Sequence, residues 1–196
     1  PGRRLPQRGE GMAGAAEAVS VAEVGGGGVM REWAGLIIDP ESYCDEHRAM
    51  LRDSHYLALP PPGALFAPAV RRAEVGIGGP RGSGPLLGVC LVGRPVARRL
   101  PQDGMTGEVT RLVLRDGLPY ATASAVLRRA AEVGRSRGMI ALIAYHDRAR
   151  HTGCIYRKAG FKKDGETFGG QWGNRPGREQ SARPKPEPKR RWRLAL

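Results

Sequence analysis

The feature that most constrains the fold is an Ala-rich segment, YATASAVLRRAAEVGRSRG, that stands between two apolar runs. Ala123, Leu127 and Ala130 fall at helical spacing, and Gly138 follows them as a stop signal. The run TGEVTRLVL before this segment and the run MIALIAY after it are typical of strands, and the second is apolar throughout, as in a strand buried on both faces. A strand, a helix and a strand in this order predict a parallel β-α-β unit in a mixed α/β domain.

Shorter patterns extend this unit in both directions. The segments RRAEVGIGG and PLLGVCLVGRPV flank the glycine-rich GGPRGSG, which predicts a β-hairpin. Asp39 and Pro40 carry the signals of a helix start, so a helix is expected from there to about Asp53. HTGCIYRKAGF predicts a short helix ending at Gly160, and KKDGETF predicts the first strand of another hairpin.

Alternation predicts the two faces of the strand in TGEVTRLVLRDG. One face should carry Val109, Arg111 and Val113, and the other Thr110, Leu112 and Leu114.

The chain is strongly basic, with a formal net charge of +13 over 196 residues and a pI near 10.6. This charge favours a polyanionic partner such as nucleic acid, or an anionic cofactor or membrane surface. The three cysteines, Cys44, Cys90 and Cys154, lack the paired CxxC spacing of zinc or redox sites, which favours a reduced, cytoplasmic protein. No apolar run approaches the roughly 20 residues that span a bilayer, so no membrane partner is expected.

Composition divides the chain into three parts. Residues 1–29 contain no aromatic residue and are expected to form a disordered extension. Gly25 to Gly28 imply purine-rich codons, as in a ribosome-binding site. A further hypothesis is therefore that this extension is not translated in the native protein, which would start at Val29 or Met30. Residues 30–175 are predicted to form one catalytic domain. Residues 176–196 are rich in Pro, Arg and Lys and predict an extended basic tail.

The order of these elements, together with the motif IYRKAGF, carries a resemblance. A hairpin, a strand, a long helix, a buried strand and a short helix with Tyr-x-x-x-Gly-Phe follow one another over roughly residues 33–172. This resembles the GNAT N-acetyltransferase superfamily. The resemblance implies a single α/β (α+β) domain with a mixed central sheet and flanking helices, and transfer of an acyl group to an amine.

A narrower resemblance is to the Mom proteins of Mu-like phages, GNAT-like enzymes that modify DNA adenines. EVTRLVLRDG, SHYLALP, KRRW and YHDRARHTGCIYRKAGFKKDGET carry it, and the last contains the matching Asp147, His151, Gly153, Ile155 and Tyr156. The resemblance implies transfer of a carbamoylmethyl or acetamido group to the N6 amine of adenine in double-stranded DNA, which protects the DNA from restriction.

The segment before the long helix departs from the GNAT pattern. Acetyltransferases place Arg/Gln-x-x-Gly-x-Gly/Ala there, so that backbone amides hold the CoA pyrophosphate, whereas this chain has RDGLPYATAS. The cofactor therefore stays unknown, with acetyl-CoA and another acyl donor both open. Donor contacts are expected from Arg111, Leu112, Leu114 and Ser124. Alternatively, Arg111 would form a surface ion pair with Glu108, and Ser124 would be only a small residue that the helix start tolerates.

Three side chains are candidates for catalysis. An exocyclic adenine amine is a weak nucleophile, so its modification needs positioning, a base and an acid. Asp147 follows the buried strand and would act as base, or else would only cap the next segment. Tyr156 would protonate the leaving group, or else would place its ring in the core. Tyr56, next to His55, would stack on a flipped base, or else would pack in a loop.

Basic side chains would contact DNA phosphates, with a solvated charged face as the alternative. The candidates are Arg94, Arg98, Arg99, Lys189, Arg190 and Arg191. His146, Asp147, His151 and Cys154 are close in sequence, but four ligands in one short segment rarely converge, so no metal site is predicted.

The sequence thus predicts a Mom-like DNA-modifying transferase. One alternative is an acetyl-CoA-dependent N-acetyltransferase of a small amine or protein, and another is a non-catalytic DNA-binding protein. The donor, the target sequence and the oligomeric state stay open.

Overall fold

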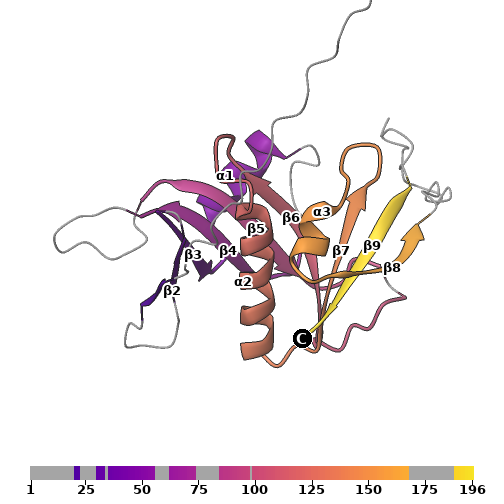
Figure 1. Ribbon diagram of the computed structural model, residues 1–196. Coiled ribbons are helices and arrows are strands. Elements are labelled where there is room, and N and C mark those ends of the chain that lie inside the picture. The colour runs from indigo at the N-terminus through magenta and orange to yellow at the C-terminus, as the bar shows by residue number, and fades with distance from the viewer. Residues whose placement is uncertain are drawn as a thin grey trace, which may run out of the picture.

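One mixed β-sheet organises the chain (Figure 1). The computed structural model describes residues 20–22, 30–33, 35–55, 62–73, 84–97, 99–167 and 188–196. Within them, nine strands lie in the order β1-β2-β3-β4-β5-β6-β7-β9-β8. The strands are β1 (Ser20–Ala22), β2 (Met30–Trp33), β3 (Leu36–Glu41), β4 (Ala64–Arg72), β5 (Leu86–Gly93), β6 (Thr106–Leu114), β7 (Ala141–Asp147), β8 (Lys162–Thr167) and β9 (Lys189–Ala195). The helices are α1 (Asp45–Ser54), α2 (Thr122–Ser136) and α3 (Cys154–Lys158). The predicted mixed sheet with flanking helices in a single domain is confirmed.

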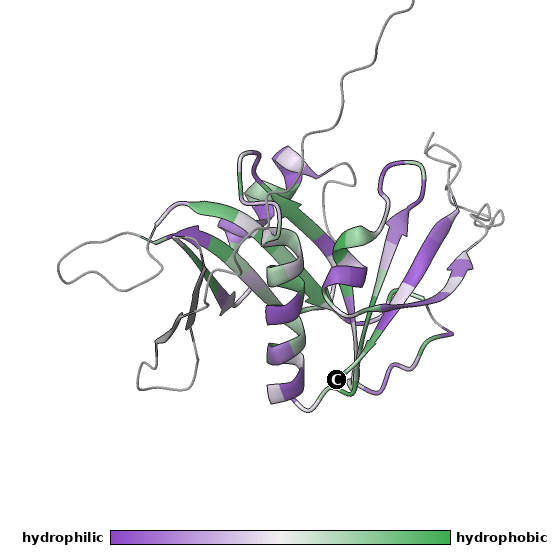
Figure 2. Cartoon of the chain, in the orientation of Figure 1, coloured by the Kyte–Doolittle hydropathy of each residue, from purple (hydrophilic) through white to green (hydrophobic). Residues whose placement is uncertain are grey.

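The two longer helices lie on opposite faces of the sheet. Leu51 of α1 belongs to one apolar cluster with Val89 and Leu91 of β5, whereas Leu127 of α2 belongs to a second cluster with Val92. Successive residues of a strand point to opposite faces, so each cluster fills one side. Figure 2 shows the apolar residues concentrated in the central strands, while β8 and β9 are more hydrophilic.

The Ala-rich segment forms α2 as predicted. Its buried face includes Val126, Leu127, Ala130 and Ala131. Gly138 follows the helix end with a φ of 76°, a left-handed conformation that glycine adopts without steric cost. The helix therefore ends where the sequence indicates.

The strands β6 and β7, joined by α2, are the parallel pair of the sheet. They are paired only over Thr106–Val109 and Ala141–Ala144. Beyond these residues β6 stays paired with β5, and β7 stays paired with β9. The two strands therefore separate toward their carboxyl ends.

A β-bulge in β6 marks the point of separation. Leu91 of β5 pairs with Arg111, but the next residue, Val92, pairs with Val109, so Thr110 is an extra residue. Its hydroxyl donates to the Leu91 carbonyl at 3.3 Å. A bulge bends its strand and increases the local twist. The bend directs the second half of β6 away from β7.

The bulge also corrects the predicted faces of β6. Val109 lies with Leu112 in the cluster beneath α2, whereas Val113 lies in the cluster beneath α1. One extra residue shifts the alternation by one position, so Val109 and Val113 point to opposite faces.

The described part of the predicted basic tail is a strand, so that prediction is wrong for Lys189–Ala195. These residues form β9, which lies between β7 and β8 and pairs with both. Trp192 is buried in the core beneath α2, and Leu194 packs against that core. Basic and apolar residues alternate in KRRWRLA, so the charge hid a period-two strand. Residues 176–187 lie outside the described residues.

The predicted helix start at Asp39 is also wrong. Asp39 and Pro40 belong to β3, and α1 begins at Asp45. Pro40 lies opposite Pro68 of β4. Neither proline has an amide hydrogen, so the pair leaves no backbone donor of its own without a partner at this position of the ladder.

The predicted disordered extension is corrected over three residues. Ser20–Ala22 form β1 and pair with β2, and the rest of residues 1–29 lie outside the described part. In the ranges that the structure describes, no helix is long and apolar enough to cross a membrane.

Candidate functional site

A cavity of about 820 Å³ opens where β6 and β7 separate. On β7, Ala144 belongs to the cluster beneath α2, so Tyr145 faces the α1 side and His146 faces the side of α2 and α3. Side chains of both sides line the cavity, which therefore passes through the gap between the strands. The α1 side contributes His55, Glu108, Arg111, Tyr145 and Lys189, and the other side contributes Leu112, His146, Cys154, Ile155 and Tyr156.

Glu108 places a buried carboxylate in this cavity. Glu108 is 7% exposed, and its Oε2 accepts a hydrogen bond from the Val96 amide at 2.8 Å. Burial raises the pKa of Glu108, and the Val96 amide and the positive charges of Lys189 and Arg111 oppose that shift. A raised pKa makes this carboxylate a better proton acceptor. Sequence reasoning did not select Glu108 as a site residue, although a glutamate inside the strand TGEVTRLVL was the available signal.

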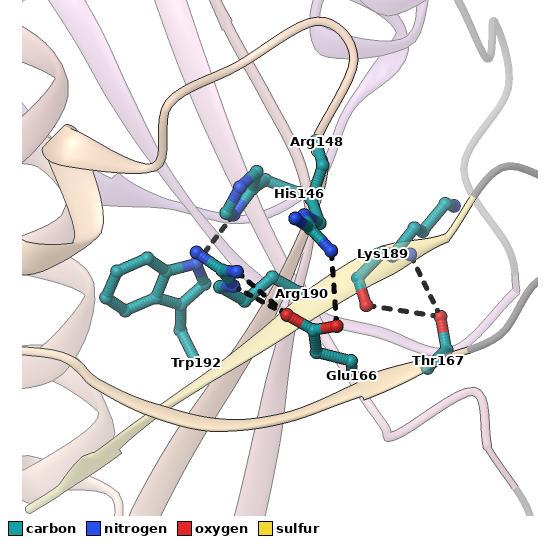
Figure 3. A network of polar contacts seen from close by, with 7 residues as sticks. All are labelled: His146, Arg148, Glu166, Thr167, Lys189, Arg190 and Trp192. Carbon is teal, nitrogen blue, oxygen red and sulfur yellow. Dashed lines mark hydrogen bonds and ion pairs between the residues drawn. The ribbon is translucent and has the colours of Figure 1, made fainter.

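The wall on the α3 side is an aromatic stack. The Tyr156 ring lies 6.1 Å from His146 and 5.8 Å from Trp192, measured between ring centroids, and is nearly parallel to both. Trp192 donates its indole N–H to His146 Nδ1 at 2.6 Å (Figure 3). An indole nitrogen can only donate, so neutral His146 carries its proton on Nε2. Burial lowers the pKa of His146, with Arg190 and His151 adding to the effect, which favours this neutral form.

Gly153 lets the chain pass close to this stack. It has a φ of 74°, and a Cβ atom built there would lie 2.6 Å from His146 Cε1 and 2.6 Å from Trp192 Cζ2. Both the backbone and the available space therefore require glycine at this position.

Asp147 does not line the cavity. Its Oδ1 accepts the Ala149 amide at 2.9 Å, and its Oδ2 lies 3.4 Å from Nε of Arg150. The Asp147 carbonyl accepts the His151 amide at 3.0 Å. These bonds stabilise the turn after β7, as in the capping alternative for Asp147. Tyr156, by contrast, does line the cavity.

The residues expected to contact the donor divide into two groups. Arg111 and Leu112 line the cavity, and Arg111 Nη1 donates to the Thr110 carbonyl at 2.7 Å. Leu114 packs against the core beneath α2. Ser124 is buried and its hydroxyl donates to the Ala121 carbonyl at 2.9 Å, so it is turned into the helix and away from a ligand.

The basic residues expected at DNA divide in the same way. Lys189 and the exposed Arg99 line the cavity, and Arg94 is exposed outside it. Arg190 pairs with Glu166 at 2.8 Å, and Arg191 pairs with Asp164 at 2.9 Å, so two ion pairs to β8 hold them (Figure 3 draws the first).

Two predicted site residues, Tyr56 and Arg98, lie outside the described residues. His55, which precedes the first of them, lines the cavity. Burial lowers the pKa of His55 to about 4, with help from the charge of Arg111, so its ring is neutral at pH 7. No group of His, Cys, Asp and Glu side chains in the described ranges could hold a metal ion.

The first turn of α2 lies free of acidic residues and has no side-chain cap. Tyr120 precedes it and is 78% exposed, with Lys158 Nζ 4.2 Å from its ring centroid. The Tyr120 hydroxyl lies 3.9 Å from Sγ of Cys154. Hydrogen bonds to Thr152 and Tyr120 lower the pKa of the Cys154 thiol.

Comparisons of the fold find acetyltransferases. The IAA acetyltransferase of Bacillus cereus is 15% identical, with a TM-score of 0.54 over 82% of this chain and 99% of that one. A GNAT family acetyltransferase of Elizabethkingia anophelis, solved with acetyl-CoA bound, is 12% identical, with a TM-score of 0.55 over 84% and 100%. A Bacillus subtilis acetyltransferase in complex with CoA is 14% identical, with a TM-score of 0.51 over 82% and 97%.

No protein-family model matches the sequence, and a search of curated proteins finds no match in sequence. The narrower resemblance to Mom proteins therefore gains no support from these comparisons. The similarities in structure show that this chain has the fold of the GNAT acetyltransferases.

Proposed function

We propose that this chain is an acyl-CoA-dependent N-acyltransferase that transfers an acetyl or similar acyl group to an amine. The observation that carries the proposal is the cavity through the β6–β7 gap, with the buried Glu108 on one side and Tyr156 on the other. A cavity lined by residues of both faces would let a donor and an acceptor approach the same point from opposite sides.

The α3 side fits a CoA-type donor. Beyond Val109, no described strand pairs with the β7 side of β6. The amide and carbonyl groups of an open strand edge can bind an extended amide chain, which is what the CoA arm offers. The uncapped first turn of α2 and the nearby Lys158 would hold its phosphates. These groups replace the missing glycine pattern.

Two side chains of the cavity would move the protons of the transfer. The donor supplies an acyl thioester: the acceptor nitrogen forms a bond to the acyl carbon, and the bond between that carbon and sulfur breaks. Glu108 would accept the proton that the nitrogen releases. Tyr156 would donate a proton to the departing sulfur. The products are an N-acylated acceptor and free CoA.

Acetyl transfer from labelled acetyl-CoA to a panel of amines, read by mass spectrometry, tests the proposal. The wild-type protein should acetylate at least one amine, and Glu108→Gln should slow this by about 100-fold or more while leaving acetyl-CoA affinity unchanged. Transfer at the full rate by Glu108→Gln would assign the base elsewhere.

DNA adenine modification is a second candidate, favoured by the net charge of +13 and by Arg99 and Lys189 at the cavity. Nucleoside mass spectrometry of DNA from cells that produce the protein tests it. A new adenosine mass would support this candidate, and unmodified DNA under good expression would count against it.

A further inference from the structure

We infer that the α1 side of the cavity binds an acceptor amine that also carries an anionic group, a carboxylate or a phosphate monoester, held by Lys189 and Arg111. The inference rests on the proposed acyl transfer, because it names the class of acceptor for the same cavity.

Positive charge exceeds negative charge in the cavity wall. The described residues that line it include Arg99, Arg111, Arg150 and Lys189 but a single acid, Glu108. Arg150 has its own partner outside the cavity, the carboxylate at the end of β7, at 3.4 Å. Glu108 can offset one more cation. Among the described residues, cations therefore outnumber acids in the cavity wall.

Two of these cations, Lys189 and Arg99, form no ion pair with a carboxylate of the described residues. The backbone of Lys189 is fixed by two bonds to the Thr167 hydroxyl (Figure 3), and its side chain lines the cavity. An ammonium group held in a cavity wall is suited to bind an anion.

Lys189 and Arg111 lie beside the proposed base. In the sheet register Lys189 pairs with Asp147, two residues beyond Tyr145, so its side chain shares the α1 face with Tyr145. Both cations act on Glu108 and on His55, which places them around the same part of the cavity. An acceptor whose amine faces Glu108 would therefore have its anionic group within reach of both.

Arg111 is positioned by the bulge of β6. Its Nη1 donates to the carbonyl of Thr110 at 2.7 Å, which fixes the guanidinium at the strand gap. A guanidinium is planar and matches the geometry of carboxylate and phosphate oxygens. The bulge that opens the cavity thus also orients one of its two anion-binding groups.

A small acceptor fits these charges better than duplex DNA does. The neighbouring basic residues of β9, Arg190 and Arg191, are paired with carboxylates of β8. Lys189 and Arg99 lie instead in the wall of a cavity of about 820 Å³. A site for the phosphates of a duplex would need its unpaired cations on the outer surface.

Matched ligand pairs test the inference. β-Alanine is compared with β-alaninamide, and phosphoethanolamine with ethanolamine, by NMR measurement of their affinity for the CoA-loaded protein. The anionic member of at least one pair should bind about tenfold more tightly or better, since a charge-assisted hydrogen bond contributes that much. Lys189→Gln and Arg111→Gln should each remove most of this preference. Arg193→Gln, an exposed position of the same strand away from the cavity, should keep it.

Several results would overturn the inference: equal binding within each pair, no measurable binding by any pair, or a preference that survives Lys189→Gln. A short DNA duplex is tested in the same way. If it binds more tightly than every anionic amine and Lys189→Gln weakens its binding, these residues bind DNA instead of an anionic amine. Acetyl-CoA binding is measured first, because its absence would refute the proposed function itself. Acetylation of neutral amines without any anion preference would refute the acceptor class alone.

Discussion

Replacing Gly153 with alanine tests the packing of the cavity wall. The residue has a φ of 74°, and its new Cβ would lie 2.6 Å from ring atoms of both His146 and Trp192. The left-handed conformation costs a non-glycine residue about 1–2 kcal/mol. Overpacking a close-packed region costs about 1–3 kcal/mol more. Gly153→Ala should therefore lower the free energy of unfolding by about 2–5 kcal/mol.

Gly104→Ala is the matched control. Gly104 has a similar φ of 79°, but nothing lies within 4 Å of a Cβ built there. It should lose only the backbone contribution of about 1–2 kcal/mol. The difference between the two variants then isolates the contact with the aromatic stack. Since 1 kcal/mol shifts the Tm of a chain of this size by about 2–4 °C, Gly153→Ala should unfold about 2–12 °C below Gly104→Ala.

Urea unfolding and thermal scans of both variants measure this difference. Equal destabilisation by the two substitutions would refute the placement of Gly153 against His146 and Trp192. A stable Gly153→Ala protein would refute the left-handed backbone as well.

Three further predictions concern titrating groups in the cavity. Glu108→Gln should lower the kcat of acetyl transfer by about 100-fold to 10,000-fold. Because the pKa of Glu108 is raised above the usual 4.5, the wild-type rate should fall as the pH drops through that raised value. If the rate of Glu108→Gln falls over the same pH range, Glu108 is not the general base. The thiol pKa of Cys154 is lowered, whereas burial raises the pKa of Cys90 to about 12. Iodoacetamide should therefore alkylate Cys154 well before Cys90. Acetyl-CoA should slow the reaction at Cys154. Equal rates, or no protection, would count against the donor site. The pKa of His55 is about 4 in the fold and 6.5 as its ordinary value, so the unfolded chain binds more protons between these values. Urea unfolding should show stability falling from pH 6.5 to pH 4, and His55→Gln should reduce that dependence; an unchanged slope would refute the burial of this ring.

The parts of the fold that depend on local periodicity could be predicted from the sequence. The Ala-rich segment predicted α2, and the apolar run after it predicted β7, because burial of one helix face or of a whole strand leaves a regular pattern. β9 was missed because its alternation is between Arg or Lys and apolar residues, and the excess of charge was read as a solvated tail.

The site was harder to predict, because it depends on a break in regularity. The extra residue Thr110 changes which side chains of β6 face the cavity, and nothing in the local pattern indicates a bulge. Tyr156 was found through its motif and does line the cavity. Asp147 was selected for its place after a strand, but the neighbouring turn uses its carboxylate. Glu108 became visible as a site residue once the structure showed it buried beside the gap.

Calorimetry of acetyl-CoA binding tests whether this chain takes an acyl-CoA donor in the cavity. Two tryptophan substitutions accompany the wild-type protein: Cys154→Trp places a large ring at the cavity, and Ile140→Trp places one at an exposed position that does not line it. The wild-type protein and Ile140→Trp should bind acetyl-CoA, and Cys154→Trp should not. Absence of binding by the wild-type protein, or equal binding by all three, would contradict an acyl-CoA donor in the cavity.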